Sequence, residues 1–214
     1  MLTTKRTTIA ALLMMALAGT VAIAQPHISG NLSGTLGPGS YIVDGDCNVL
    51  NGVTLTIQPG TTFLHTGHFT WSINGTLIAN GTASDSIRFM RQNPVPQHLW
   101  GGLRFSPTIP QQNSLDYCVI QDVQNGTSPV QPEVLGGGIY VMGNYLHVNH
   151  SRIYACQVGH DGAGIYAYYA TMLVIENTVI DSCTADIGGG IYLSTSNGAQ
   201  VKDCVISRNR STGT

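Results

Sequence analysis

The sequence predicts an all-β solenoid in which each repeat of about two dozen residues forms one coil of short strands. Glycine motifs followed by Ile-Tyr place Tyr140, Tyr166 and Tyr192 at equal intervals of 26 residues. The segments between these motifs alternate apolar and polar residues over four to six positions and end at Gly, Asn, Asp or Ser, as strands do. After residue 24 no window shows the sustained 3.6-residue period of a helix, so helical repeats are poor candidates.

Residues 1–24 have the features of a cleaved secretory signal peptide. Two basic residues precede an apolar stretch, and Ala22 and Ala24 form a cleavage site before Gln25. The stretch is short for a membrane span, although a retained anchor is the alternative. We therefore expect an exported chain, secreted to the extracellular space or held at the outer membrane or cell surface, with no membrane span after signal removal.

Residues 25–114 are expected to form the first coils of the solenoid, shorter and less regular than the later ones. Val53, Leu55 and Ile57 alternate with polar residues before a Pro-Gly turn. Later strand-like segments in this part also end at turn signals such as Asn-Gly.

Residues 115–214 are expected to form regular coils of about 26 residues. Like residues recur at intervals of 33, 27 and 26, and the surplus in the first interval lies in a Pro-rich loop. The isoleucine column is Ile120, Ile153, Ile180 and Ile206. Stacking would place the members of a column about 4.8 Å apart. Glycines would turn each corner, because Gly adopts positive φ and admits a neighbouring backbone, and the Ile-Tyr pair would fill the core.

The spacing also predicts how the solenoid ends. A further Gly-Ile-Tyr motif would reach position 218, beyond Thr214, and no capping segment precedes that end. We expect about eight or nine coils and an open, uncapped C-terminal edge, which exposes unpaired backbone groups. The expectation is a fragment of a longer surface protein, or a chain completed by a partner at this edge.

Composition excludes some partners. Residues 25–214 hold seven basic and eleven acidic residues without a cluster of either sign, and charged residues make up 9% of the chain. Nucleic acid is therefore not an expected partner. The surface should be polar and nearly uncharged, which suits a polysaccharide or a cell-surface glycan.

Longer segments resemble a known family. "YIVDGDCNVLNGVTLTIQPGTTF", "INGTLIANGTASDSIRFM" and "IENTVIDSCTADIGGGIYL" are similar to segments of secreted bacterial right-handed parallel β-helix proteins, including polymorphic outer-membrane surface proteins. The resemblance covers nearly all of residues 38–214 and implies a right-handed parallel β-helix. It does not select a function, because this architecture serves lyases, hydrolases, adhesins and surface proteins.

Candidate ligand-binding residues are few, and no catalytic residue, metal site or cofactor is expected. The carboxylates that calcium-dependent lyases of the family stack on neighbouring coils have no counterpart here. His150, Asn177 and Asp181 could grip sugar hydroxyls, or His150 could act as a general base; the alternative is a solvated polar face. Tyr168 and Tyr169 could stack on a sugar, or pack locally beneath a loop.

Two side-chain pairs have alternatives of their own. Cys156 and Cys183 share a column on adjacent coils, so they could form a disulfide or remain buried thiols. His147 and His150 are three residues apart, so on a strand they should point to opposite faces and bind no zinc.

The sequence leaves two functional classes open. The first is an exported, non-catalytic module that binds polysaccharide or another surface. The second is a polysaccharide lyase or glycoside hydrolase with a groove on the face of the coils.

Overall fold

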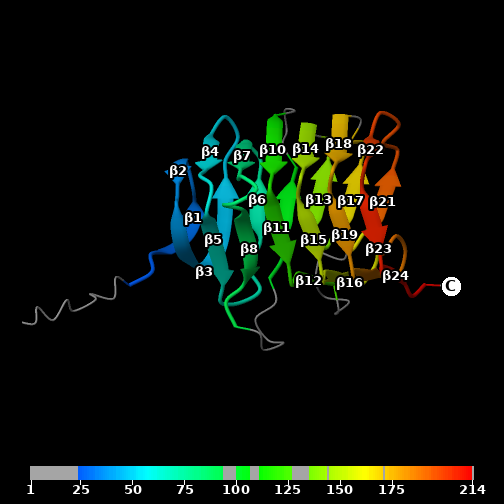
Figure 1. The fold of residues 1–214 in the computed structure, drawn as a ribbon, viewed down its shortest axis with the longest axis horizontal. Coiled ribbons are helices and arrows are strands. Elements are labelled where there is room, and N and C mark those ends of the chain that lie inside the picture. The colour runs from blue at the N-terminus through cyan, green and yellow to red at the C-terminus, as the bar shows by residue number, and fades with distance from the viewer. Residues whose placement is uncertain are drawn as a thin grey trace, which may run out of the picture.

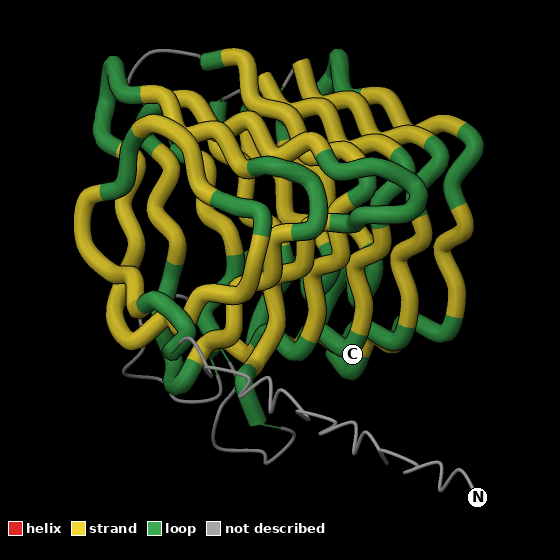
Figure 2. The backbone as a smooth tube through the Cα atoms, turned by 60° about the vertical axis from the view of Figure 1, so that its left-hand side comes forward, coloured by secondary structure: helices red, strands yellow, loops and turns green. Residues whose placement is uncertain are grey.

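Short segments of alternating apolar and polar residues, separated by turns, fold here into stacked coils and do not form hairpins. The computed structural model describes residues 24–93, 100–106, 111–126, 135–143, 145–170 and 172–213, and within these ranges it contains strands but no helix (Figure 1). Successive coils run side by side, with loops at the corners (Figure 2). The expected signal peptide lies outside the described residues except for Ala24. Nothing in the described part is a helix apolar and long enough to cross a membrane.

The strands form four faces, and every printed pairing between neighbouring coils is parallel. Face 1 contains β6 (Trp71–Ile73), β9 (Leu103–Phe105), β13 (Ile139–Met142), β17 (Ile165–Tyr168) and β21 (Ile191–Ser194). Face 2 contains β2 (Gly34–Leu36), β4 (Thr54–Ile57), β7 (Thr76–Asn80), β10 (Gln112–Asp116), β14 (Tyr145–Asn149), β18 (Met172–Glu176) and β22 (Gln200–Lys202). Face 3 contains β5 (Thr61–His65), β8 (Ile87–Arg91), β11 (Cys118–Gln121), β15 (Arg152–Tyr154), β19 (Val179–Asp181) and β23 (Val205–Ser207). Face 4 contains β12 (Gln124–Asn125), β16 (Gln157–Val158), β20 (Thr184–Ala185) and β24 (Arg210–Ser211).

The two remaining strands lie at the N-terminal end. The long strand β3 (Gly39–Val49) pairs with β5 through its first half and with β6 through its second half. It thereby joins faces 1 and 3 into one sheet of 13 strands, and β1 (His27–Asn31) pairs with β3.

The register confirms the predicted solenoid. Tyr140 pairs with Tyr166 and Tyr166 with Tyr192, and the isoleucine column is in register across face 3. The number of coils agrees with the lower expected value, because β1, β3 and the six strands of face 3 stack in eight levels, whereas face 2 has seven strands. Ile78 pairs with Ser114, so these two residues lie on adjacent coils although they are 36 positions apart in the sequence.

The core column consists of isoleucines and not of tyrosines. Ile139 and Ile165 are fully buried, whereas Tyr140 and Tyr192 are only partly buried and lie on the outside. Adjacent residues of a strand point to opposite faces, so an Ile-Tyr pair cannot fill the core with both side chains. The tyrosines instead stack on one another outside the coil, with ring centroids 5.4 Å apart.

The corners explain the glycines. Gly136, Gly162 and Gly188 have φ between 64° and 70° where face 4 leads into face 1. A Cβ on Gly164 would lie 2.4 Å from the carbonyl oxygen of Gly190 on the next coil, so close backbone approach also requires glycine there. Both predicted roles of these glycines are therefore confirmed.

Other corners use non-glycine residues in the same left-handed conformation. Between faces 2 and 3, the four stacked corner residues have φ between 42° and 49°, and they are Tyr117, His150, Asn177 and Asp203. Among the described strands, those of the coil β21–β24 come last in their sheets.

The N-terminal coils have an aromatic core. Phe63, Trp71 and Phe89 pack with ring centroids 4.9–5.5 Å apart. Beside them His65 is fully buried, and its ring stacks on Trp100 at 4.1 Å. Later coils pack aliphatic side chains at the equivalent places.

Candidate functional site

A groove of about 530 Å³ lies on the outer side of face 2. Its lining residues lie on β7, β10, β14, β18 and β22, with Gly198 in the loop before β22. These five strands belong to successive coils, so the groove extends along the axis for about 19 Å at the usual strand spacing. Its lining residues are Ile78, Gln112, Asn113, Ser114, Tyr145, Leu146, His147, Met172, Val174, Glu176, Gly198 and Gln200.

One imidazole–carboxylate pair crosses the groove. Register places His147 beside Val174 and Asn149 beside Glu176, so His147 and Glu176 are diagonal neighbours on adjacent coils. His147 donates from Nε2 to Oε1 of Glu176 at 2.7 Å. Both side chains are partly exposed, so each remains accessible to a ligand. The other polar lining groups are amides and two hydroxyls, those of Ser114 and Tyr145, and groups of these kinds can hydrogen-bond to a ligand in either direction.

The groove has an apolar rim at the corner between faces 1 and 2. Tyr145 and Met172 begin their strands there and are 36% and 49% exposed. Tyr168 and Tyr169, two of the predicted ligand-binding residues, lie at the same corner, where their rings meet edge to face at 4.3 Å. They precede Met172 in the chain but do not line the groove.

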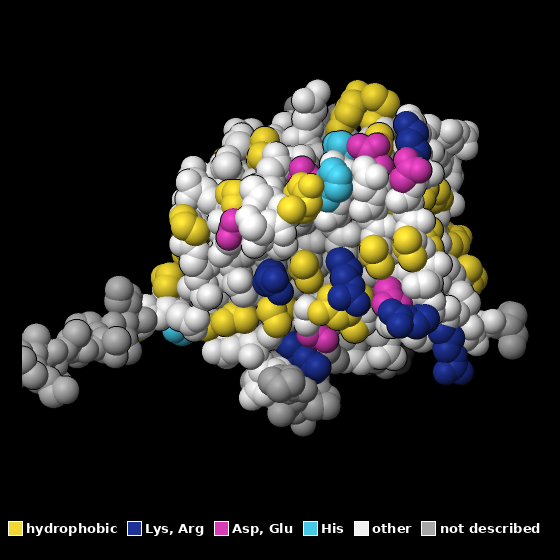
Figure 3. Space-filling view, in the orientation of Figure 1, with side chains coloured by type: hydrophobic (Ala, Val, Ile, Leu, Met, Phe, Trp, Pro, Cys, Tyr) yellow, Lys and Arg dark blue, Asp and Glu magenta, His cyan; other side chains and the backbone are white. Residues whose placement is uncertain are grey.

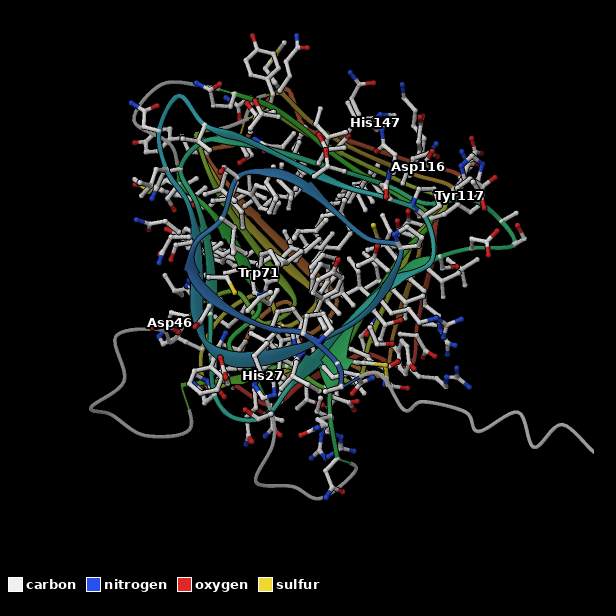
Figure 4. All side chains as sticks on the ribbon, turned by 90° about the vertical axis from the view of Figure 1, so that its left-hand side faces the viewer. His27, Asp46, Trp71, Asp116, Tyr117 and His147 are labelled. Carbon is white, nitrogen blue, oxygen red and sulfur yellow. The ribbon has the colours of Figure 1, made fainter. Side chains whose placement is uncertain are left out.

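His150 and Asn177 lie at the opposite end of the face 2 strands. His150 pairs through Nδ1 with Oδ1 of Asp116 at 3.2 Å, and its ring stacks on that of Tyr117 at 4.6 Å. Asn177 donates to Asn149 at 3.0 Å. His147, Asp116 and Tyr117 lie on one side of the coil, well away from Trp71 in its interior (Figure 4).

The predicted residues therefore do not form one cluster. The five-residue strand β18 separates the corner of Tyr169 from that of Asn177 by about 17 Å. The groove occupies the surface between them, so the two groups border its two long sides.

Asp181 lies on face 3, apart from the groove. Its side chain is 3% exposed, Arg208 donates to both of its carboxylate oxygens, and Arg152 lies 3.7 Å away. These arginines lower the pKa of Asp181 to about 2, chiefly through the hydrogen bonds from Arg208. The arginines thus occupy both carboxylate oxygens of Asp181 and leave neither free for a sugar hydroxyl.

The sequence reasoning missed His147 and Glu176 as a pair. It assumed that His147 and His150 continue one strand, but His150 has a φ of 42° and turns the corner, which breaks the alternation. Both histidines are consequently exposed, and each faces a carboxylate of a different coil. The pair could have been found from the 27-residue interval between these two coils. This interval aligns His147 with Val174 and Asn149 with Glu176, so His147 and Glu176 are diagonal neighbours.

The structure has all five cysteines as free thiols. Cys156 and Cys183 are buried on adjacent coils, one residue before the paired Gln157 and Thr184. Burial raises the pKa of the Cys156 thiol well above its usual range. A disulfide between the two stays a prediction. No group of three or more His, Cys, Asp or Glu side chains that could hold a metal ion occurs in the described part of the chain.

The comparisons with known proteins bear on the family. A family model described as "Right handed beta helix region" matches residues 97–214, which is more than half of the chain. No curated protein and no solved structure gives a significant match.

Proposed function

The chain belongs to the right-handed β-helix family, and from that premise we propose that it is an exported, non-catalytic module that binds a polysaccharide in the groove of face 2. Membership alone does not select this function, because the fold serves many chemistries. The observation that carries the proposal is the groove itself, which crosses five successive coils and therefore suits a linear polymer rather than a single small molecule.

The chemistry of the lining supports a sugar polymer. Exposed Tyr145 and Met172 provide apolar surface for the faces of sugar rings, while Gln112, Ser114 and Gln200 offer hydrogen bonds to hydroxyl groups. The ionisable lining groups, His147 and Glu176, hydrogen-bond to each other, and the remaining lining groups are uncharged. A long ligand would also reach the two bordering corners, with Tyr168 and Tyr169 on one side and His150 and Asn177 on the other.

Export is supported by residues 1–24, whose basic start, apolar stretch and small-residue cleavage site match a secretory signal. An exported chain meets extracellular or cell-surface glycans. The expected location is therefore outside the cell or on its surface, and the first test is the N-terminal sequence of the chain recovered from the medium or envelope.

A glycan array followed by calorimetry tests binding. We expect the chain beginning at Gln25 to bind one class of polysaccharide, and Tyr145→Ala to weaken that binding about tenfold, because one stacked ring is lost. The matched control is Leu50→Ala, which removes an equally exposed apolar side chain (45%) outside the groove. Equal affinity of the Tyr145→Ala variant and the control would refute the groove as the binding site.

The His147–Glu176 pair favours a second candidate, a glycoside hydrolase or polysaccharide lyase. A partly exposed imidazole held by a carboxylate can transfer a proton to or from a bound substrate. A depolymerisation screen separates the two candidates. Cleavage that disappears in His147→Gln but persists in His27→Gln would replace the binding function, since His27 forms a similar exposed pair with Asp44 at 2.8 Å, outside the groove.

A further inference from the structure

Most of the positive charge of the described chain lies on face 3 or close to its border with face 4. Seven basic residues occur in residues 25–214, and five of them lie on the strands of face 3, at its corner with face 4, or on β24 beyond that corner. The five are Arg88, Arg91, Arg152, Arg208 and Arg210. Figure 3 shows most of the visible Lys and Arg side chains on the lower part of the surface, with one at the upper right, while most of the visible His side chains and several acidic ones lie on the upper part. We call the lower surface the arginine face.

The ion pairs leave this face with a surplus of positive charge. Arg152 and Arg208 share the single carboxylate of Asp181, and Arg91 pairs with Asp122 at 3.3 Å. Arg88 and Arg210 form no ion pair with any residue that the structure describes. Five guanidinium groups thus face two carboxylates, although residues 25–214 as a whole are net negative.

Two of the five arginines, Arg152 and Arg208, are both accessible and held in place. The side chain of Arg208 is 72% exposed and that of Arg152 48%. Asp181 fixes both from beneath, and the guanidinium of Arg152 also lies over the ring of Tyr154, 4.1 Å from its centroid. A preorganised guanidinium loses less entropy when it binds an anion than a free side chain does.

Aliphatic side chains separate the arginines along the helix axis. Register places Val119 between Arg88 and Arg152, and Val179 and Val205 follow in the same outward row. Two strand spacings, about 10 Å, therefore separate Arg88 from Arg152. The result is an array of cations on a sheet surface with apolar surface between them, in contrast to the groove on face 2.

We propose that the arginine face binds the phosphate groups of an anionic lipid surface. Guanidinium groups donate two parallel hydrogen bonds to phosphate, and an array of separated arginines suits a plane of head groups better than one small anion. Each basic residue near such a surface strengthens attraction about fivefold. Three surplus charges give about a hundredfold preference over an uncharged membrane. This contact goes beyond glycan binding, and it leaves the groove on a different face of the coil.

Vesicle cosedimentation tests the proposal with the chain beginning at Gln25, which contains every described strand. The probes are vesicles of phosphatidylcholine with and without 30% phosphatidylglycerol. We expect binding to the anionic vesicles only, weakened about fivefold by Arg88→Gln and about 25-fold when Arg152→Gln is added, and weakened further by salt. The matched control is Lys202→Gln, which removes one charge from face 2 and should change binding less than twofold.

Other results would overturn the proposal. Equal loss in Arg88→Gln and Lys202→Gln would show a dependence on net charge rather than on this face. Binding that prefers a soluble polyanion such as polygalacturonate, or that inorganic phosphate at millimolar concentration abolishes, would show that the ligand is not a lipid surface. If removal of Arg152 unfolds the chain, Arg88→Gln with Arg210→Gln replaces the double variant, because neither residue forms a described ion pair. Glycan binding by Tyr145→Ala is measured separately, so either proposal can fail alone.

Discussion

The buried imidazole of His65 should make the fold sensitive to acid. His65 accepts a hydrogen bond at Nε2 from the indole N–H of Trp71 at 3.0 Å, so Nδ1 carries the proton and donates to the carbonyl oxygen of Met90 at 2.9 Å. Protonation would place a second N–H against the indole donor, inside the core. Burial accordingly lowers the pKa of His65 to about 3.

The size of the effect follows from linkage. An unfolded histidine has a pKa of about 6.5, so the unfolded chain binds a proton at this residue between about pH 6.5 and 3 while the folded chain does not. Stability from neutral His65 is complete above that window and is lost as the pH falls through it. The loss is about 2 kcal/mol between pH 7 and pH 5, and it approaches 5 kcal/mol near pH 3.

Urea unfolding followed by far-ultraviolet circular dichroism at pH 7 and pH 5 measures this loss. Carboxylates also titrate, so the comparison is with His65→Gln, whose stability should fall by about 2 kcal/mol less over the same interval. NMR gives a direct check, because the ring resonances of His65 should not titrate above pH 5. A midpoint near 6.5, or parallel losses in the two proteins, would refute the reasoning.

Two further predictions concern close contacts in the later coils. Gly164→Ala should lower the free energy of unfolding by about 1–3 kcal/mol, because its Cβ would lie 2.4 Å from a carbonyl oxygen. Gly143→Asn should change the free energy of unfolding little, because Asn tolerates the φ of 58° and an added Cβ would have no atom within 4 Å. Urea titration of both variants measures the two changes, and equal losses would contradict the prediction. A thiol reagent should label Cys204 first in the folded, reduced chain, because the other four cysteines are buried. Rapid labelling of Cys156 would contradict its burial, and a peptide that links Cys156 to Cys183 would favour the disulfide over the alternative of two buried thiols.

The order of the coils could be predicted from the sequence because stacking turns spacing into position. Tyr140, Tyr166 and Tyr192 recur at a constant interval, and the structure pairs them directly. The side that they face was predicted wrongly, since the period alone does not say which member of an Ile-Tyr pair points inward. The sequence also does not show whether the long interval from Ile78 to Ser114 makes one coil or two.

The candidate surfaces were harder to predict, because their residues come together only across coils. Arg88 and Arg152 are 64 residues apart in the sequence, yet only β11 lies between their strands. Nothing in the local sequence indicates a basic cluster there. The pair of His147 and Glu176 also depends on knowing that His150 leaves the strand, and a left-handed histidine has no clear local signature.

Tryptophan and tyrosine side chains are distributed unevenly along the stack of coils, so their optical signals come from different parts of the molecule. Both tryptophans, Trp71 and Trp100, are buried near the N-terminal end, whereas the tyrosine stack from Tyr140 to Tyr192 lies on the later coils. Fluorescence from indole therefore reports on the earlier coils, and absorbance from phenol reports mainly on the later coils, which hold every tyrosine except Tyr41 and Tyr117. Coils that contact only their neighbours need not melt together. The two signals, recorded in one titration, would reveal whether one end opens before the other.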